Sequence, residues 1–204
     1  MTKQAHEKRT WAARGRAGAA SILAAASLAG CGGGSNPFDN PDSVNNAPTT
    51  AGQTLAFAYF QKCIQPILLA RSCAASGCHD NNSSTGGALR LRPGAAQIDL
   101  SNTAITLDVI RTSDMYKTFV SSQASAIVGA SAQSMLLRKP LVQGTLHGGG
   151  VIFGNNQDPD VKVLEYWINR PVPLGQDELS PASYSMFTPT LDPANAAASI
   201  CNTQ

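Results

Sequence analysis

Residues 73–79 read Cys73-Ala-Ala-Ser-Gly-Cys78-His79, two cysteines separated by four residues with a histidine directly after the second. Histidine is scarce in this chain, which has 3 histidines in 204 residues. A disulfide between the two cysteines has no use for an adjacent imidazole. The position of His79 therefore needs an explanation of its own, and that explanation depends on the compartment in which the chain works.

The first thirty residues predict that compartment. Five basic residues precede an apolar run, Ala19–Leu28. This run is too short to span a bilayer, which needs about 20 residues, but it suits the centre of a secretory signal. It ends in Leu28-Ala29-Gly30-Cys31, which resembles the lipobox of bacterial lipoproteins. We therefore expect residues 1–30 to be a lipoprotein-type signal peptide and Cys31 to carry lipid; a plain secretory signal and a buried helix are the alternatives.

The charge of the chain changes when this signal is removed. The whole chain has 15 Lys and Arg and 13 Asp and Glu, and the first thirty residues hold five of the basic residues and one of the acids. The mature chain therefore has 10 basic and 12 acidic residues, a net charge of −2. This balance gives no reason to propose a nucleic-acid partner. We expect a lipid-anchored protein of the bacterial cell envelope, on the periplasmic or outer-membrane face.

Composition divides the mature chain into three parts. Residues 31–52 are rich in Gly, Ser, Asn, Pro and Asp and predict a flexible tether, with an ordered surface arm as the alternative. Residues 53–175 contain the periodic apolar segments and are expected to form the domain. Residues 176–204 form an irregular C-terminal tail. Hydrophobic residues make up 43% of the chain, which is enough for one modest core.

The domain is predicted to be mainly α, with short helices joined by long loops. Residues 54–72 have helical spacing, but Pro66 lacks an N–H and should break or kink that helix. Ser113 is a candidate N-cap for a helix to Val120, and residues 131–139 predict another that ends at Pro140. Asp158-Pro159 opens the strongest helix. Long loops of this kind need a large cofactor or cross-links to hold them.

A lipidated Cys31 leaves four cysteines, and free thiols are not expected in an oxidising compartment. Two arrangements use all four. In one, Cys73 and Cys78 bind a haem through thioethers while Cys63 forms a disulfide with Cys201. In the other, the four cysteines form two disulfides and no haem is bound. A zinc site is a third alternative, disfavoured because an exported cysteine pair tends to oxidise first.

Covalent haem attachment explains His79. Two sulfur atoms fix one edge of the macrocycle, and the residue that follows places its imidazole under the iron. The usual spacing has two residues between the cysteines and this chain has four, but longer spacers occur among c-type cytochromes. The motif therefore favours one covalently bound haem c with His79 as the proximal iron ligand.

The surrounding residues resemble a family of bacterial c-type cytochrome domains. In that family, a helix that carries Ile-x-Pro-Ile-Leu runs into the attachment motif, as "FQKCIQPILLARSCAASGCHD" does here at residues 60–80. Further similar segments are "TGGALRL" (85–91), "SMLLRKP" (134–140), "HGGG" (147–150) and "VLEYWINR" (163–170). The resemblance covers roughly residues 54–170. It implies a cytochrome c-like fold around one haem.

Few residues of the mature chain are candidates for the second axial ligand of the iron. Removal of the signal leaves only His79 and His147, and His147 precedes three glycines that let the backbone approach a macrocycle closely. Cytochrome c-like domains usually supply their distal ligand from the loop before the terminal helix, where His147 lies. Met135, Met115 and an open coordination position are the alternatives. Two histidine ligands imply a lower reduction potential than histidine with methionine.

These features together predict an electron carrier that exchanges electrons with redox protein partners. The sequence holds no Ser/His/Asp set, no paired carboxylates and no glycine-rich nucleotide loop, so an enzyme is not expected. Two alternatives stay open. One is an accessory haem domain of an oxidoreductase, which needs an open iron position. The other is a disulfide-stapled surface lipoprotein that binds a partner and has no redox chemistry.

Overall fold

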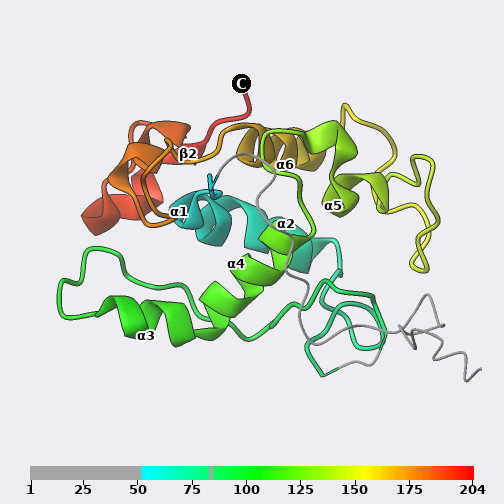
Figure 1. Ribbon diagram of the computed structural model, residues 1–204, viewed down its shortest axis with the longest axis horizontal. Helices are drawn as coiled ribbons and strands as arrows, with labels where there is room; N and C mark the ends of the chain where they lie inside the picture. The colour runs from blue at the N-terminus through cyan, green and yellow to red at the C-terminus, as the bar shows by residue number, and fades with distance from the viewer. Residues whose placement is uncertain (1–51, 83–84) are drawn as a thin grey trace, which may run out of the picture. The chain divides into compact units, whose positions relative to one another are not determined.

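One helical segment runs through the middle of the fold in the computed structural model, which describes residues 52–82 and 85–204 (Figure 1). The segment consists of α1 (Phe57–Tyr59), a π-helical turn (Phe60–Ile64) and α2 (Gln65–Ala70). The expected signal peptide, the lipidated cysteine and nearly all of the expected tether lie outside the described residues. Within the described ranges, no helix is long and apolar enough to cross a membrane.

The break in this helix that was predicted at Pro66 does not occur. The residues before it keep right-handed helical angles, with φ −85° and ψ −49° at Ile64 and φ −57° and ψ −44° at Gln65. Pro66 lies in the first turn of α2, directly after the π-helical turn. A π-helical turn shifts the hydrogen-bond pattern by one residue, and a proline is tolerated in a first turn where an N–H is not required. The helical segment therefore continues into the cysteine motif.

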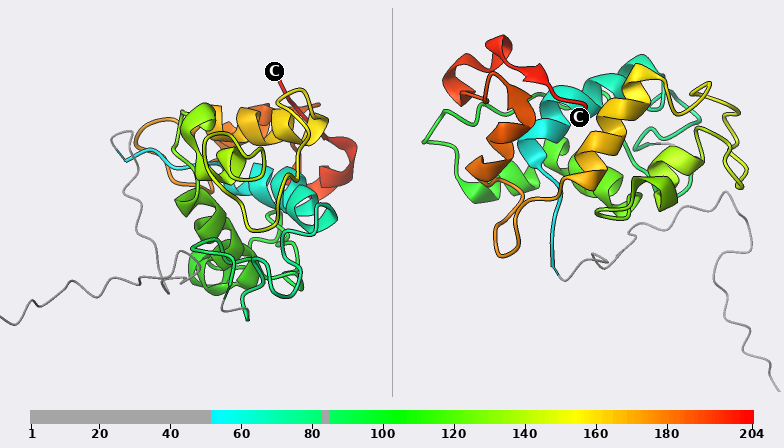
Figure 2. Two further views of the ribbon diagram at one scale, coloured as in Figure 1. Left: turned by 90° about the vertical axis from the view of Figure 1, so that its right-hand side faces the viewer. Right: turned by 90° about the horizontal axis from the view of Figure 1, so that it is seen from above.

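Two further helices pack on the π-helical turn: α4 (Asp114–Ala124) and α6 (Pro159–Asn169) (Figure 2). An aromatic cluster joins the three. The ring of Phe60 lies 5.5 Å from the rings of both Phe119 on α4 and Trp167 on α6. Trp167 is fully buried, and its indole Nε1 donates a hydrogen bond to the Ala56 carbonyl at 3.0 Å. Aromatic side chains buried in this way contribute roughly 2–3 kcal/mol each.

The helix starts follow the capping residues in the sequence. The Ser113 hydroxyl accepts the Tyr116 N–H at the start of α4, after the short helix α3 (Leu107–Thr112). The Asp158 carboxylate accepts the Asp160 N–H at the start of α6, with Pro159 in the first turn. Both predicted starts are confirmed.

The helix expected over residues 131–139 is divided. A 3-10 turn (Ser131–Gln133) precedes α5 (Met135–Arg138), because Ser134 between them is extended, with φ −72° and ψ 127°. The Ser134 hydroxyl accepts the Ile127 N–H, so this residue joins α5 to the loop after α4.

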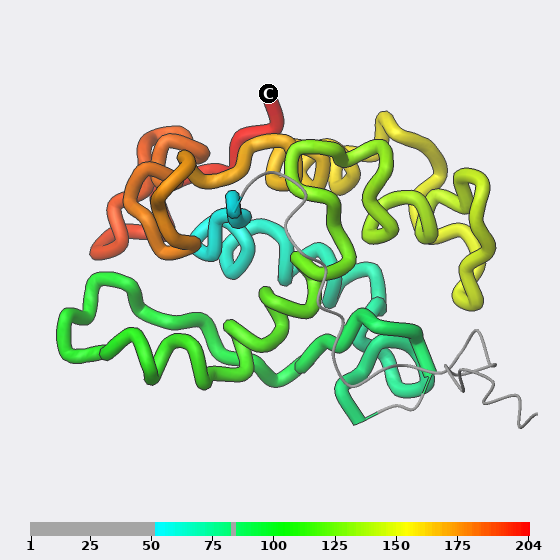
Figure 3. The backbone as a smooth tube through the Cα atoms, in the orientation of Figure 1, coloured from blue at the N-terminus to red at the C-terminus, as the bar shows by residue number. Residues whose placement is uncertain are grey.

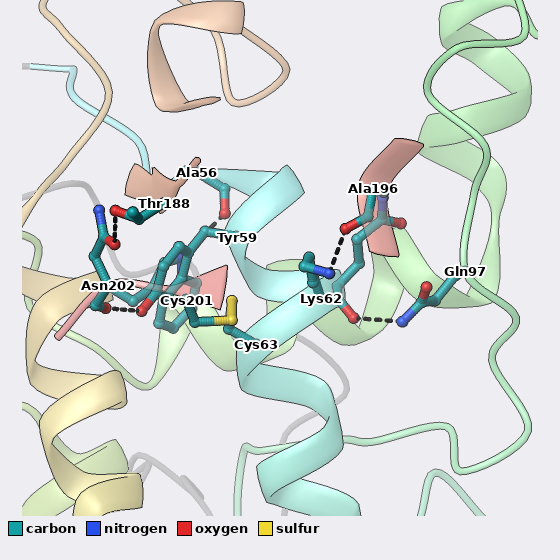
Figure 4. Close-up of a disulfide and its surroundings, with 11 residues drawn as sticks. Ala56, Tyr59, Lys62, Cys63, Gln97, Thr188, Ala196, Cys201 and Asn202 are labelled. Carbon is teal, nitrogen blue, oxygen red and sulfur yellow. Dashed lines mark hydrogen bonds between the residues drawn. A yellow bond between two sulfur atoms is a disulfide. The ribbon is translucent and has the colours of Figure 1, made fainter. Parts of the chain in front are cut away.

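The C-terminal tail is more regular than expected. It contains 3-10 turns at Pro181–Met186 and Pro193–Ala198 and a small antiparallel sheet of β1 (Phe187–Thr188) and β2 (Ile200–Cys201). Cys63 of the π-helical turn forms a disulfide with Cys201 of β2, the pairing that the sequence favoured (Figure 4). The described residues are thus partly helical with few strands, which agrees in part with the predicted mainly α fold.

Candidate functional site

The cysteine motif folds into a compact loop at the end of α2. Ser72 has a positive φ of 58°, which turns the chain out of the helix. The Cys78 N–H donates to the Ala75 carbonyl at 2.9 Å, and the His79 N–H donates to the Cys73 carbonyl at 3.0 Å. The loop therefore closes on itself and holds both cysteines beside the histidine.

A glycine in the next segment supports this loop. Gly86 has a φ of 90°, and a Cβ built on it would lie 2.0 Å from the Cys78 carbonyl oxygen. Further along, the Leu91 N–H donates to the His79 carbonyl at 2.7 Å, and the Asn81 N–H donates to the Leu91 carbonyl at 2.8 Å. The segment around "TGGALRL" thus packs directly on the backbone of the cysteine motif, and no residue larger than glycine fits at position 86.

His147 lies on a loop that leaves and returns at one point. The amides of Ile152 and Phe153 both donate to the Pro140 carbonyl, at 2.8 and 3.3 Å, so residues 141–151 project from a closed base. Figure 3 traces this loop and the cysteine loop at the same end of the molecule. A Cβ on Gly149 would lie 3.1 Å from the Cε1 of His147, so glycine at this position lets the ring lie against the backbone.

The two loops bring the rings of the two histidines close together and nearly parallel. The ring centroids of His79 and His147 are 6.1 Å apart, and the ring planes differ by 13°. The Nδ1 of His79 lies 3.2 Å from the Leu89 carbonyl, and the Nδ1 of His147 lies 2.8 Å from the Gly150 carbonyl. A carbonyl oxygen only accepts, so each Nδ1 carries the hydrogen. In the neutral form, a ring with its hydrogen on Nδ1 has its lone pair on Nε2, as in metal-binding histidines held by a backbone carbonyl.

The centroid spacing of the two rings is close to the span expected for two imidazoles that bind one metal ion. A bond from a metal to an imidazole nitrogen is about 2 Å long, and the ring centroid lies roughly 1 Å beyond the nitrogen. Two imidazoles on opposite sides of one ion therefore have centroids roughly 6 Å apart. Among residues 52–82 and 85–204, no group of three or more His, Cys, Asp or Glu side chains is arranged to hold a metal. A haem iron needs only two protein ligands, because the porphyrin supplies the other four.

The surroundings of His79 favour its neutral imidazole form. Burial lowers the pKa of His79 below its ordinary 6.5, and the positive charges at Lys139 and Arg90 and the neighbouring His147 lower it further, against the opposing effect of the bond to Leu89. Neutral imidazole is the form that binds metal.

The two thiols of the motif are free and partly buried, with no disulfide between them. Burial raises the pKa of the Cys73 thiol to about 11, with a smaller contribution from Cys78. Cys73 is therefore a protonated thiol at neutral pH.

Apolar side chains surround His147 at the surface. Leu146 is 89% exposed and Val151 is 65% exposed, and these two residues bracket the short segment of His147 and its three glycines. Of the alternative ligands, Met115 is 1% exposed within the core on α4, whereas Met135 is 45% exposed.

Two shallow hollows lie elsewhere, beside the end of α6. One is lined by Glu165 and the C-terminal residues, and the other by Pro171 and Met186, among others. Neither includes a residue of the cysteine motif or His147, and neither brings together a comparable pair of metal ligands. The histidine pair is thus the stronger candidate site.

Sequence patterns predicted both histidines of this pair as candidate ligands, but not the groups that hold them in place. Lys139 and the carbonyls of Leu89 and Gly150 carry no local signal, because their roles depend on how distant loops meet. Comparison of the chain with models of protein families, with curated proteins and with solved structures found no match. The cytochrome resemblance therefore depends on the motifs alone, and the function is argued from the site.

Proposed function

We propose that this chain is a membrane-anchored c-type cytochrome with one haem, which carries electrons between redox proteins of the bacterial cell envelope. The observation that carries the proposal is the histidine pair: parallel rings 6.1 Å apart, each with its Nδ1 directed at a backbone carbonyl. The free thiols of Cys73 and Cys78 on the same loop as His79 support covalent attachment.

The two cysteines and the two histidines have separate roles in this proposal. Cys73 and Cys78 would hold the haem through thioether bonds, each formed by addition of a thiol S–H across one vinyl group with no net gain or loss of electrons. His79 is the proximal iron ligand and His147 the distal one. A bound haem supplies reversible one-electron exchange at its iron. By filling the sixth position, His147 excludes small ligands and so favours electron transfer over catalysis.

The remaining parts of the chain fit a carrier on a membrane. Lipid on Cys31 anchors the protein, and residues 31–52 act as a tether that lets the domain reach its redox partners. The domain of residues 53–175 adopts a cytochrome c-like arrangement of short helices around the haem, and the disulfide staples the C-terminal tail to it.

Production of the chain in a host competent for cytochrome maturation tests the proposal. A pyridine haemochrome spectrum and the intact mass should show one covalently bound haem, and replacement of Cys73 and Cys78 together by serine should abolish it. The mass also reports the lipid on Cys31. A colourless protein without added porphyrin mass contradicts the proposal and favours the surface lipoprotein without redox chemistry.

A second measurement identifies the distal ligand. The reduced His147→Ala protein should bind carbon monoxide at concentrations at which the unaltered protein and a Met135→Leu control do not. Carbon monoxide binding gained by the Met135→Leu protein instead assigns the ligand to Met135. Ready binding by the unaltered protein indicates an open iron position and an accessory haem domain.

A further inference from the structure

We propose that Arg71 is a positioning residue that ties the loop of His147 to the segment of His79 and so keeps the distal histidine within reach of the iron. The inference rests on the proposed haem function and assigns this role to a residue that binds neither iron nor porphyrin. It follows from two contacts of the Arg71 guanidinium group and from the position of the Arg71 backbone beside the cysteine motif.

The first contact is with the start of α6. The Arg71 Nη2 lies 2.9 Å from both carboxylate oxygens of Asp158, and its Nε donates to Oδ2 of Asp160 at 2.7 Å. Planar, multiple hydrogen bonds of this kind fix orientation as well as distance, which a lysine ammonium does not do. The guanidinium is therefore held in one place relative to α6.

The second contact is with the base of the His147 loop. The Arg71 Cζ lies 5.1 Å from the centroid of the Phe153 ring, within the range of a cation–π interaction. Phe153 is 2% exposed, and its amide donates to the Pro140 carbonyl at the point where the loop returns. The guanidinium thus covers the buried ring that anchors the loop.

The third link is the backbone of Arg71 itself. Arg71 is the C-cap of α2 and lies two residues before Cys73 in the sequence. Its carbonyl also lies 4.0 Å from the Cys73 sulfur. The segment that carries the haem attachment and the loop that carries the distal ligand are therefore connected through a single side chain.

This arrangement predicts an effect on ligation rather than on global stability. The Arg71 side chain is 33% exposed, and partly exposed ion pairs contribute little to the free energy of unfolding. The two histidine rings, however, match the span of one metal ion closely, so a small displacement of the loop detaches His147. Loss of Arg71 should increase the fraction of molecules in which the distal position is open.

The experiment uses the holoprotein with Arg71→Met, Arg71→Lys and a control, Lys162→Met. The control breaks the Lys162–Glu165 pair on α6, whose side chains are 36% and 28% exposed. The measurements are the absorption spectrum, the reduction potential and the apparent carbon monoxide affinity of the reduced protein. An Asp160→Asn variant keeps the Asp158 cap and tests the same link from the other side.

We expect the apparent carbon monoxide affinity of Arg71→Met to rise about tenfold, since it scales with the fraction of molecules that have an open distal position. Arg71→Lys and Asp160→Asn should give smaller rises, and Lys162→Met none. An unchanged carbon monoxide affinity and potential in Arg71→Met overturns the inference while the proposed function stands. An unaltered protein without haem overturns both.

Discussion

Removal of the Cys63–Cys201 disulfide should destabilise the protein strongly and leave the histidine site unchanged. The change is the double substitution Cys63→Ala and Cys201→Ala. Noncovalent contacts that hold the same segment remain, as Figure 4 shows: the Tyr59 hydroxyl donates to the Asn202 carbonyl, and the Lys62 ammonium donates to the Ala196 carbonyl at 2.6 Å. The native tail should therefore stay in place, and most of the loss should come from the freed unfolded chain.

The magnitude follows from the length of chain that the disulfide closes. The two cysteines are 138 residues apart in the sequence. Chain entropy for a loop of this length predicts a contribution of about 5 kcal/mol, and measured values are more often about 2–4 kcal/mol. With a urea dependence of about 1–3 kcal/mol per molar, a loss of about 4 kcal/mol lowers the unfolding midpoint by about 2 M urea.

Urea unfolding followed by tryptophan fluorescence measures this loss. The chain has 2 tryptophans, Trp11 and Trp167, and Trp11 lies in the expected signal peptide, so the mature protein should report through the buried Trp167. A reductant should shift the midpoint of the unaltered protein toward that of the double variant and leave the variant unaffected. A shift below about 0.5 M urea refutes the entropic argument. A changed haem spectrum in the folded double variant refutes the claim that the histidine site is independent of the C-terminal tail.

Three further predictions concern His147, Gly86 and Glu178. His147→Met should keep the iron six-coordinate and raise the reduction potential, as redox titration would show; an unchanged potential removes His147 from the ligand set. Gly86→Ala should lower haem incorporation and cost at least about 2 kcal/mol more in unfolding experiments than Gly87→Ala, because only at position 86 does a Cβ meet the Cys78 carbonyl. Burial raises the pKa of Glu178, but the hydrogen bonds that its carboxylate accepts outweigh this effect, so the folded-state pKa is lowered. Glu178 therefore contributes stability at pH values above its pKa in the unfolded chain, which is about 4.3. That stability should be lost as the pH falls through the lowered folded-state pKa, and Glu178→Gln should flatten this part of the pH–stability curve; an unchanged curve contradicts the assignment.

Local signals predicted the helices that begin with a capping residue. The side chains of Ser113 and Asp158 each accept a hydrogen bond from a backbone N–H in the first turn of the helix that follows. The start of each helix therefore depends on a few adjacent residues. Pro66 misled the prediction because its effect depends on the hydrogen-bond pattern of the preceding turn. Nothing in the composition of residues 60–64 announces a π-helical turn.

The C-terminal tail contains structure that local sequence patterns do not predict. Strands of two residues, such as Phe187–Thr188 and Ile200–Cys201, are too short to show alternation. They exist because the disulfide and the Asn202 contact fix the segment on the first helix. Structure of this kind depends on partners more than one hundred residues away and cannot be predicted locally.

The two histidines of the candidate site were predictable from the sequence, and the geometry of the pair was not. Scarcity of histidine in the mature chain pointed to His79 and His147, and the glycines after His147 pointed to close backbone approach. The parallel orientation of the rings depends on the carbonyls of Leu89 and Gly150, whose positions are set by two separate loops. Every residue has a backbone carbonyl, so the sequence does not indicate which carbonyls orient the rings, and only the fold shows them.

The fold separates the residues that stabilise the domain from those that form the site. Trp167 and its aromatic neighbours are buried around the first helix, whereas His147 lies on a loop that presents Leu146 and Val151 to solvent. A loop with exposed apolar side chains gains little from the core, so its position depends on the bonds to Pro140, on the hydrogen bonds of Gln143 to Arg138 and Asn156, on the Arg71–Phe153 contact and, under the proposed function, on the haem. Ligation of iron by His147 should therefore order the loop as much as the loop positions His147. The protein without haem should accordingly keep its helical core and show faster amide hydrogen exchange across residues 141–151 than the haem-bound protein. Equal exchange rates in the two forms would show that the loop is fixed by the polypeptide alone.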